Sequence, residues 1–398
     1  MRTVAFLLSL IMIFTIPWED AITVSGIGAL TMVIGLLAGI AWLFSVVVRG
    51  TFRRPHLFHI LVYCFIIWSI LSIFWSTADA ETMKRILTIS QLGIMAWILW
   101  DLYQTPNAMR PALQVYILGG FVAIGSTIYV YLNGQEISIY SGGRYAGANL
   151  NAVDLALILI LGIPLAWHLA VTGGYGKAVW IQRLVNLAYI PMALFAIILT
   201  GTRTAIFAMI PAAVYIVVTT SHLKPLFRVL ILAAVIVSLF TLLPIIPQAS
   251  IDRLSTAGNS IAEGDLGGRV RLWNASLAIF EGHPLLGIGA GSLRAPVWLG
   301  ALAHNTFLSV LAELGLIGFT LFAAILTVVV YQAFRQPRSY RGLWLTVLAV
   351  WVIGVFTLSW EFRKPTWLFL SLVVISANLA SESHQFVIHA KYPAQAEA

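Results

Sequence analysis

The chain has 398 residues, of which 60% are hydrophobic and only 10% are charged, and its mean hydropathy is +0.93 with a formal net charge of +8. This much apolar surface exceeds what the core of a soluble domain can bury, so the composition excludes an ordinary soluble globular protein. The single cysteine, Cys64, excludes an internal disulfide framework and a cysteine-based zinc site.

Polar breaks divide the chain into about twelve apolar runs, each close to the ~17–25 helical residues that cross a hydrocarbon core. In chain order they lie at 3–17, 25–48, 57–75, 86–102, 112–132, 152–171, 184–200, 205–220, 229–246, 306–333, 342–359 and 366–380. The first run follows a basic residue, as in a signal peptide, but no small-residue cleavage site comes after it, so we expect it to be retained. The predicted fold class is an all-α polytopic membrane protein with residues 1–398 as a single integral membrane domain.

The distribution of basic residues predicts that both termini are cytoplasmic. In that orientation thirteen Lys and Arg residues lie in cytoplasmic loops, against six in short outer loops and four in one long outer loop. This excess in the cytoplasmic loops follows the positive-inside rule. Eleven of the 15 acidic residues then lie outside. The net charge therefore reflects topology, and we expect the basic patches to face membrane lipid headgroups, with no nucleic-acid partner.

One connection is much longer than the others. Residues 247–304 form a polar excursion on the outer face, between the ninth and tenth predicted spans, and a loop of this length in a compact protein is expected to be ordered and functional. It contains a glycine-led helix predicted over 269–281. Arg269 and Trp273 share one face of this helix, whereas Arg271 points elsewhere.

The end of the long loop contains two further features. His283 precedes a proline and is interpreted as a turn residue. The stretch GIGAGS at 287–292 resembles a phosphate-binding loop, but it follows no strand, so a nucleotide site is not expected there. We interpret its glycines as allowing a tight re-entrant path near the bilayer.

Several arginines gather on the predicted outer face. Arg203 lies in a short turn between two apolar runs, where an unpaired guanidinium is costly. It either extends to lipid headgroups or binds an anionic ligand. Because a guanidinium is a planar fork of donors, two or three of them together would neutralise a diphosphate. The candidate anion-binding arginines are Arg144, Arg203, Arg269, Arg271 and Arg294.

His304 and Asn305 lie at the start of the tenth apolar run. Histidine can accept a proton near neutral pH, so His304 is a candidate general base. The alternative is that the pair caps the helix, with Asn305 as the N-cap residue. Asn149 and Asn305 are candidate substrate-binding residues, together with Arg144.

Acidic residues on the outer side include two closely spaced pairs, Asp79 with Glu81 and Glu263 with Asp265. This spacing can hold a divalent cation together with a phosphate. Such pairs are common by chance in solvated loops, so we assign no metal site. Glu313, inside the tenth run, must be paired or protonated, and we expect it to pack against another helix.

Four motifs follow one another over about 140–320: RYAGANLNAVDLAL, LTGTRTA, GRVRLWNASLAIFEGHPLLGIGAG, and AHNTFL with AELGLIG. In this order they resemble the O-antigen ligase and O-antigen polymerase (WaaL/Wzy-like) superfamily of bacterial envelope glycosyltransferases. The resemblance implies transfer of a glycan from an undecaprenyl diphosphate donor to an acceptor hydroxyl at the periplasmic face of the inner membrane. The functional arginines and histidine of the family would fall on Arg203, Arg269 and His304, with Arg294 as a further candidate.

The residues and the resemblance together predict an inverting glycosyltransferase that needs neither metal nor cofactor. As a ligase it would use lipid A core or another surface glycan as acceptor; the alternative within the superfamily is a polymerase of O-antigen or exopolysaccharide repeat units. A transporter or flippase for lipid-linked sugars is a second class, which should show polar groups near the bilayer midplane in both halves. A metal-dependent glycosyltransferase using an acid pair is a third. The one-sided clustering of polar groups favours the first interpretation.

Overall fold

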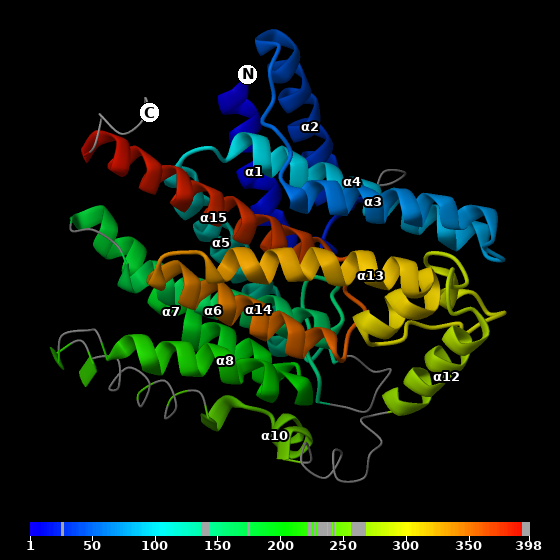
Figure 1. Ribbon diagram of the computed structural model, residues 1–398. Helices are drawn as coiled ribbons and strands as arrows, with labels where there is room; N and C mark the ends of the chain where they lie inside the picture. The colour runs from blue at the N-terminus through cyan, green and yellow to red at the C-terminus, as the bar shows by residue number, and fades with distance from the viewer. Residues whose placement is uncertain are drawn as a thin grey trace.

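The computed structural model of the protein is almost entirely helical (Figure 1). The structure describes residues 1–24, 28–136, 143–172, 176–221, 243–255 and 268–391, with positions 225–226, 228–229, 237 and 241 between them. Two short strands, β1 (Thr23–Val24) and β2 (Gly28–Ala29), form an antiparallel pair after the first helix. The predicted all-α class is therefore confirmed apart from this pair.

Eleven of the twelve predicted spans coincide with helices. The ninth, 229–246, falls largely outside the described residues, and only the short helix η5 (Leu243–Ile245) is seen at its end. The helices are α1 (Arg2–Thr15), α2 (Leu30–Arg49), α3 (Leu57–Leu71), α4 (Asp79–Leu102), α5 (Met109–Leu132), α6 (Ala152–Val171), α7 (Lys177–Leu199), α8 (Arg203–Thr220), α13 (Thr306–Phe334), α14 (Arg338–Val355) and α15 (Lys364–Lys391).

Nine helices within the described ranges are long and apolar enough to cross a membrane. The chain is thus a multi-pass membrane protein, as predicted. The helices α1 and α14 occupy predicted spans but are not among these nine, so the number twelve stays a prediction.

The helix α6 lies at the centre of the bundle, between α5, α7, α8 and α14. Its most apolar stretch is 89% buried, because these four helices surround it. Asn151 caps its first turn by accepting a hydrogen bond from the backbone N–H of Val153 at 2.9 Å. The cap fixes where α6 begins and so where Asp154, in its first turn, is placed.

Side-chain contacts distinguish the two ends of the bundle. At one, which we call the Asp101 end, Arg2 Nη2 donates to the Asp101 carbonyl at 2.6 Å and Arg53 pairs with Glu382 at 2.8 Å. The first and last helices therefore both reach this end (Figure 1). The other end, which we call the His304 end, is where α4, α6, α8 and α13 begin.

The long loop contributes two helices at the His304 end, α10 (Gln248–Ser255) and α12 (Arg269–Gly282), and the short helix η6 (Ser292–Arg294). The helix predicted over 269–281 is confirmed by α12. The helix α10 packs on α7 and α8, whereas α12 packs on α13 (Figure 1). The loop therefore spreads over the His304 end and contacts the bundle at two separate places.

Candidate functional site

His304 immediately precedes α13 and adopts a strained backbone conformation, with φ of 51°. The other non-glycine residues with positive φ in the described ranges are Ala148 and Asn149 (57° and 54°), just before α6. Non-glycine residues with positive φ are uncommon, and such strain tends to gather at functional sites. The strained positions thus mark the same segments that the sequence motifs singled out.

Asn305 is the N-cap residue of α13. Its side-chain oxygen accepts hydrogen bonds from the backbone N–H groups of Phe307 and Leu308 at 3.0 and 3.1 Å. The capping alternative is therefore confirmed for Asn305, and the cap fixes the position of the preceding His304. The indole of Trp273 donates to the His304 carbonyl at 3.4 Å and so joins α12 to this turn.

His304 lies close to the start of α12, whose first residue is Arg269. The pKa of His304 is lowered, first by burial and then by the positive charge of Arg269, although Asp154 acts in the opposite direction. Burial also lowers the pKa of Arg269. Arg271 is exposed, whereas Arg269 and Trp273 are half-buried, so the predicted division of the helix faces is confirmed. A neutral imidazole next to a fixed cation can accept a proton beside an anionic ligand.

A second group of arginines surrounds Gly201, in the turn between α7 and α8. Arg144 donates from Nε to the Thr200 carbonyl at 2.9 Å, and Arg203 donates from Nε to the Arg253 carbonyl at 3.1 Å. A Cβ atom on Gly201 would lie 3.4 Å from Arg253 Cδ and 3.5 Å from Arg144 Cγ. Three guanidinium side chains therefore converge on one turn, and we call Arg144, Arg203 and Arg253 the Gly201 cluster.

Burial and the charge of Arg203 lower the pKa of Arg253, as expected for cations held close together. Sequence reasoning missed Arg253, because nothing in the long loop indicates that α10 folds back against α7 and α8. Its place in the run QASIDRLS, beside the predicted ninth span, was the only available signal.

The start of α6 connects the Gly201 cluster with His304. The Thr202 hydroxyl donates to the Ala152 carbonyl at 3.2 Å. Asp154, two residues after Ala152, raises the pKa of His304 through its negative charge. Asp154 also accepts a hydrogen bond from Trp360 and pairs with Arg363 at 3.0 Å. Sequence reasoning did not include Asp154 or Arg363 in the site.

Arg363 is held by three carboxylates. Besides Asp154, it contacts Glu19 at 3.5 Å and Asp20 at 3.3 Å. The Asn149 side-chain amide donates to the Asp20 carbonyl at 3.3 Å, so this candidate substrate-binding residue lies at the edge of the same ionic network. The network clamps the starts of α6 and α15 and the end of the first helical segment together.

Arg294 lies apart from these groups, in η6, next to a buried ion cluster. Arg85 pairs with Glu361 at 3.1 Å and with Glu313 at 4.0 Å, and both Arg85 and Arg294 stack on Phe362. The prediction that Glu313 is paired and packs against another helix is confirmed. Arg294 is exposed, and its pKa is lowered by burial of part of the side chain and then by Arg85.

The glycines of the 287–292 loop allow it to press against a break in α13. The helix is interrupted at Gly315, with φ of 65° and ψ of −168°, and Gly289 and Gly291 donate to the Glu313 carbonyl and carboxylate at 2.9 and 2.8 Å. A Cβ atom at Gly287 would lie 2.4 Å from the Glu313 backbone. The predicted tight path is therefore confirmed at this close approach.

The remaining predicted positions take ordinary structural roles. His283 ends α12 and bonds the Ile279 carbonyl at 3.2 Å, which confirms a turn residue. Asp79 and Glu81 lie in the first turn of α4, and Glu81 pairs with Lys84 at 2.7 Å. Glu263 and Asp265 lie outside the described residues. Within the described ranges, no three His, Cys, Asp or Glu side chains gather closely enough to hold a metal ion.

These features define a class of protein, a multi-pass helical membrane protein whose candidate anion-binding arginines and candidate general-base histidine lie at one end of its bundle. Residues 188–323 match a family model described as O-antigen ligase. The match runs from α7 into α13 and includes Arg203, Arg253, Arg269, Arg294 and His304. It confirms the predicted resemblance and supports an O-antigen ligase- or polymerase-type function. A comparison with curated proteins found no match.

Proposed function

We propose that the protein transfers a glycan from an undecaprenyl diphosphate donor to an acceptor hydroxyl, at the periplasmic face of the bacterial inner membrane. The acceptor would be lipid A core or another surface glycan. The observation that carries this proposal is the Trp273–His304 hydrogen bond that brings the start of α12, with half-buried Arg269, to His304 at the end of the bundle where the Gly201 cluster also lies. Both termini would then be cytoplasmic, because α1 and α15 reach the opposite end.

The donor diphosphate would be bound by arginine. Arg203 and Arg269 are the principal candidates, with Arg294 and Arg271 as further ones, and the Gly201 cluster adds Arg253 and Arg144 to Arg203. Guanidinium forks match phosphate oxygens two at a time. Fixed cations also stabilise the negative charge that develops on the leaving diphosphate. This arrangement is why we propose that no metal and no cofactor are needed.

His304 would act on the acceptor. Its lowered pKa keeps the imidazole neutral near pH 7, so one ring nitrogen can take the proton of the acceptor hydroxyl. The hydroxyl oxygen then forms a bond to the anomeric carbon as the bond from that carbon to the diphosphate oxygen breaks. Attack from the face opposite the leaving group inverts the anomeric centre. The proton stays on His304, and the electron pair leaves with the diphosphate.

A repeat-unit polymerase of the same superfamily would need the same donor chemistry and differs only in its acceptor. A transporter or flippase for lipid-linked sugars is the other class. The side chains assigned here come from the starts of α8 and α12, from α10 and η6, and from the segments before α6 and α13, all at the His304 end. This one-sided arrangement favours transfer at a surface over passage through the bilayer.

The test is transfer by the purified full-length protein, supplied with a glycan on undecaprenyl diphosphate and with either lipid A core or a second donor molecule as acceptor. Glycan appearing on lipid A core supports the ligase, and lengthened glycan on the donor supports the polymerase. In either case His304→Ala should lower turnover by about 10²–10⁴-fold while donor binding persists. Unchanged turnover in that variant, or donor movement across vesicles without transfer, would overturn the proposal.

A further inference from the structure

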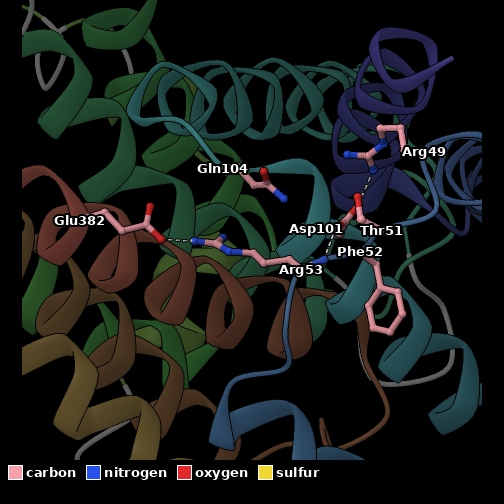
Figure 2. Close-up of a pocket in the computed structure, with 7 residues that line it drawn as sticks. All are labelled: Arg49, Thr51, Phe52, Arg53, Asp101, Gln104 and Glu382. Atoms are coloured by element: carbon pink, nitrogen blue, oxygen red, sulfur yellow. Dashed lines mark hydrogen bonds and ion pairs between the residues drawn. The ribbon is translucent and has the colours of Figure 1, made fainter.

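The Asp101 end contains a cavity of about 320 Å³ that is distinct from the candidate site. Figure 2 shows Arg49 at the end of α2, Arg53 in the connection to α3, and Glu382 on α15 around this space. The cavity is lined by Arg49, Thr51, Phe52, Arg53, Asp101, Gln104 and Glu382.

The carboxylate of Asp101 is already satisfied by the protein. It is fully buried, and its Oδ2 accepts from Trp42 Nε1 at 3.0 Å and from Arg49 Nη2 at 3.3 Å. Its Oδ1 accepts from the Arg53 backbone N–H at 2.7 Å. A buried carboxylate with three donors is neutralised locally and repels an anion in the cavity only weakly.

Arg53 neutralises the second carboxylate. Its Nη2 lies 2.8 Å from Glu382 Oε1, which also accepts from Asn378 at 2.6 Å, and its guanidinium stacks on Trp100 at 3.9 Å. Arg2 adds a further cation that contacts the Asp101 carbonyl at 2.6 Å. Within the lining, two guanidinium groups face two carboxylates, and Arg2, which does not line the cavity, adds a net positive charge beside it.

Apolar side chains of α2 lie next to the cavity and are exposed. This helix is only 17% buried in its most apolar stretch, the lowest value among the described candidate spans. Phe52, at the rim, is 56% exposed and packs against Trp97 with ring centroids 5.9 Å apart. Exposed apolar side chains on α2, which precedes Phe52 in the chain, include Leu36, Ile40, Leu43, Val47 and Val48. In a bilayer this surface faces acyl chains.

We propose that this cavity binds the phosphate-bearing headgroup of an anionic phospholipid from the leaflet at the Asp101 end. The phosphate lies against Arg49, whose described contacts use Nε and Nη2 and whose side chain is 33% exposed. Thr51 and Gln104 supply a hydroxyl and an amide for the polar part of the headgroup, and the acyl chains run along α2. Basic pockets between membrane helices commonly take anionic headgroups. This proposal does not depend on the proposed function.

The experiment measures lipid binding to the purified full-length protein by native mass spectrometry, with phosphatidylglycerol, phosphatidylcholine and inorganic phosphate as separate probes. Arg49→Gln removes the cation, and Gln104→Glu adds a negative charge at an exposed position without breaking an ion pair. Arg338→Gln is the matched control, since Arg338 is an exposed arginine at the start of α14 that does not line the cavity.

We expect retention of phosphatidylglycerol but not of phosphatidylcholine, and affinity about fivefold lower in Arg49→Gln and in Gln104→Glu, the effect of one unit charge near a membrane surface. Arg338→Gln should bind as the wild type does. Equal retention of both lipids, an equal loss in Arg338→Gln, or no loss in Gln104→Glu would overturn the proposal. Displacement of the lipid by millimolar inorganic phosphate would show a free-anion site instead.

Discussion

Arg85 and Glu361 form a buried ion pair at the His304 end, with Nη1 of the arginine 3.1 Å from Oε1 of the glutamate. The two side chains are 5% and 3% exposed, and Arg85 also stacks on Phe362 at 3.8 Å. Burial raises the pKa of Glu361 to about 7, although Arg85 lowers it and the nearby Glu313 raises it further. Two carboxylates therefore share one close cation, so Glu361 takes up a proton more readily than an exposed glutamate does.

This pair predicts a pH-dependent stability. The pKa of Glu361 in the folded protein lies above its ordinary value of 4.5, so the folded state binds more protons between about pH 4.5 and pH 7. The free energy of unfolding should fall as pH rises through this window, by on the order of 2 kcal/mol. In Glu361→Gln the decline should become smaller, because one of the two carboxylates beside Arg85 no longer titrates. Thermal unfolding of the wild type and of Glu361→Gln from pH 5 to pH 8 checks this. The same pH dependence of the unfolding free energy in both proteins would contradict it.

The proximity of Arg269 to His304 predicts the pH dependence of transfer. The pKa of His304 is lowered by burial and then by Arg269, so the neutral base should dominate above about pH 6.5 and kcat/KM should be level there. Arg269→Met removes the cation, and the acidic limb of the profile should move to higher pH, besides an overall loss of activity. Arg271→Met, on the exposed face of α12, is the control and should leave the limb in place. If Arg269→Met left the acidic limb in place, Arg269 would not influence the pKa of His304 during transfer.

The Gly201 cluster predicts a graded response to changes at Arg203. Arg203→Ala should lower kcat/KM by roughly 10–100-fold, the effect of losing a charge-assisted hydrogen bond. Arg203→Lys should recover only part of this loss, because an ammonium lacks the planar fork. Full activity in the lysine variant would show that charge alone matters. Donor binding, measured separately, should fall in parallel with activity.

Topology can be tested without an activity assay. With both termini cytoplasmic, a reporter that is active only outside the cytoplasm should work when fused near residue 260. The same reporter should be silent when fused at 222, 338 or 395. The reverse pattern would place His304 in the cytoplasm, where sugar nucleotides are the donors, and would exclude the proposed mechanism.

Transfer should not depend on a divalent cation, because fixed guanidinium groups already supply positive charge at the diphosphate. Activity should survive EDTA, and the double variant Asp79→Asn with Glu81→Gln should stay active, as should Glu263→Gln with Asp265→Asn. Turnover is measured before and after adding chelator. Loss of turnover that magnesium or manganese restores would show that a metal site carries the reaction.

The sequence by itself determined the helices and much of the local geometry. The lengths of apolar runs located eleven described helices, because a bilayer demands the same run length wherever the span occurs. The spacing of Arg269 and Trp273 on one face of α12, and the position of His304 before a capped helix, are also local, and helical periodicity reveals them directly.

Only the tertiary structure decided which distant segments meet. Arg253 joins Arg144 and Arg203 because α10 packs on α7 and α8, and Asp154 acts on His304 because α6 and α13 begin at the same end. Glu361 meets Arg85 across 276 positions of the chain. Hydropathy shows that each helix lies in apolar surroundings. Dispersion and hydrophobic contacts are non-directional, however, so they do not determine which helix becomes the neighbour. Which charges become partners is therefore set by how the helices pack, and a single sequence carries no local signal of that choice.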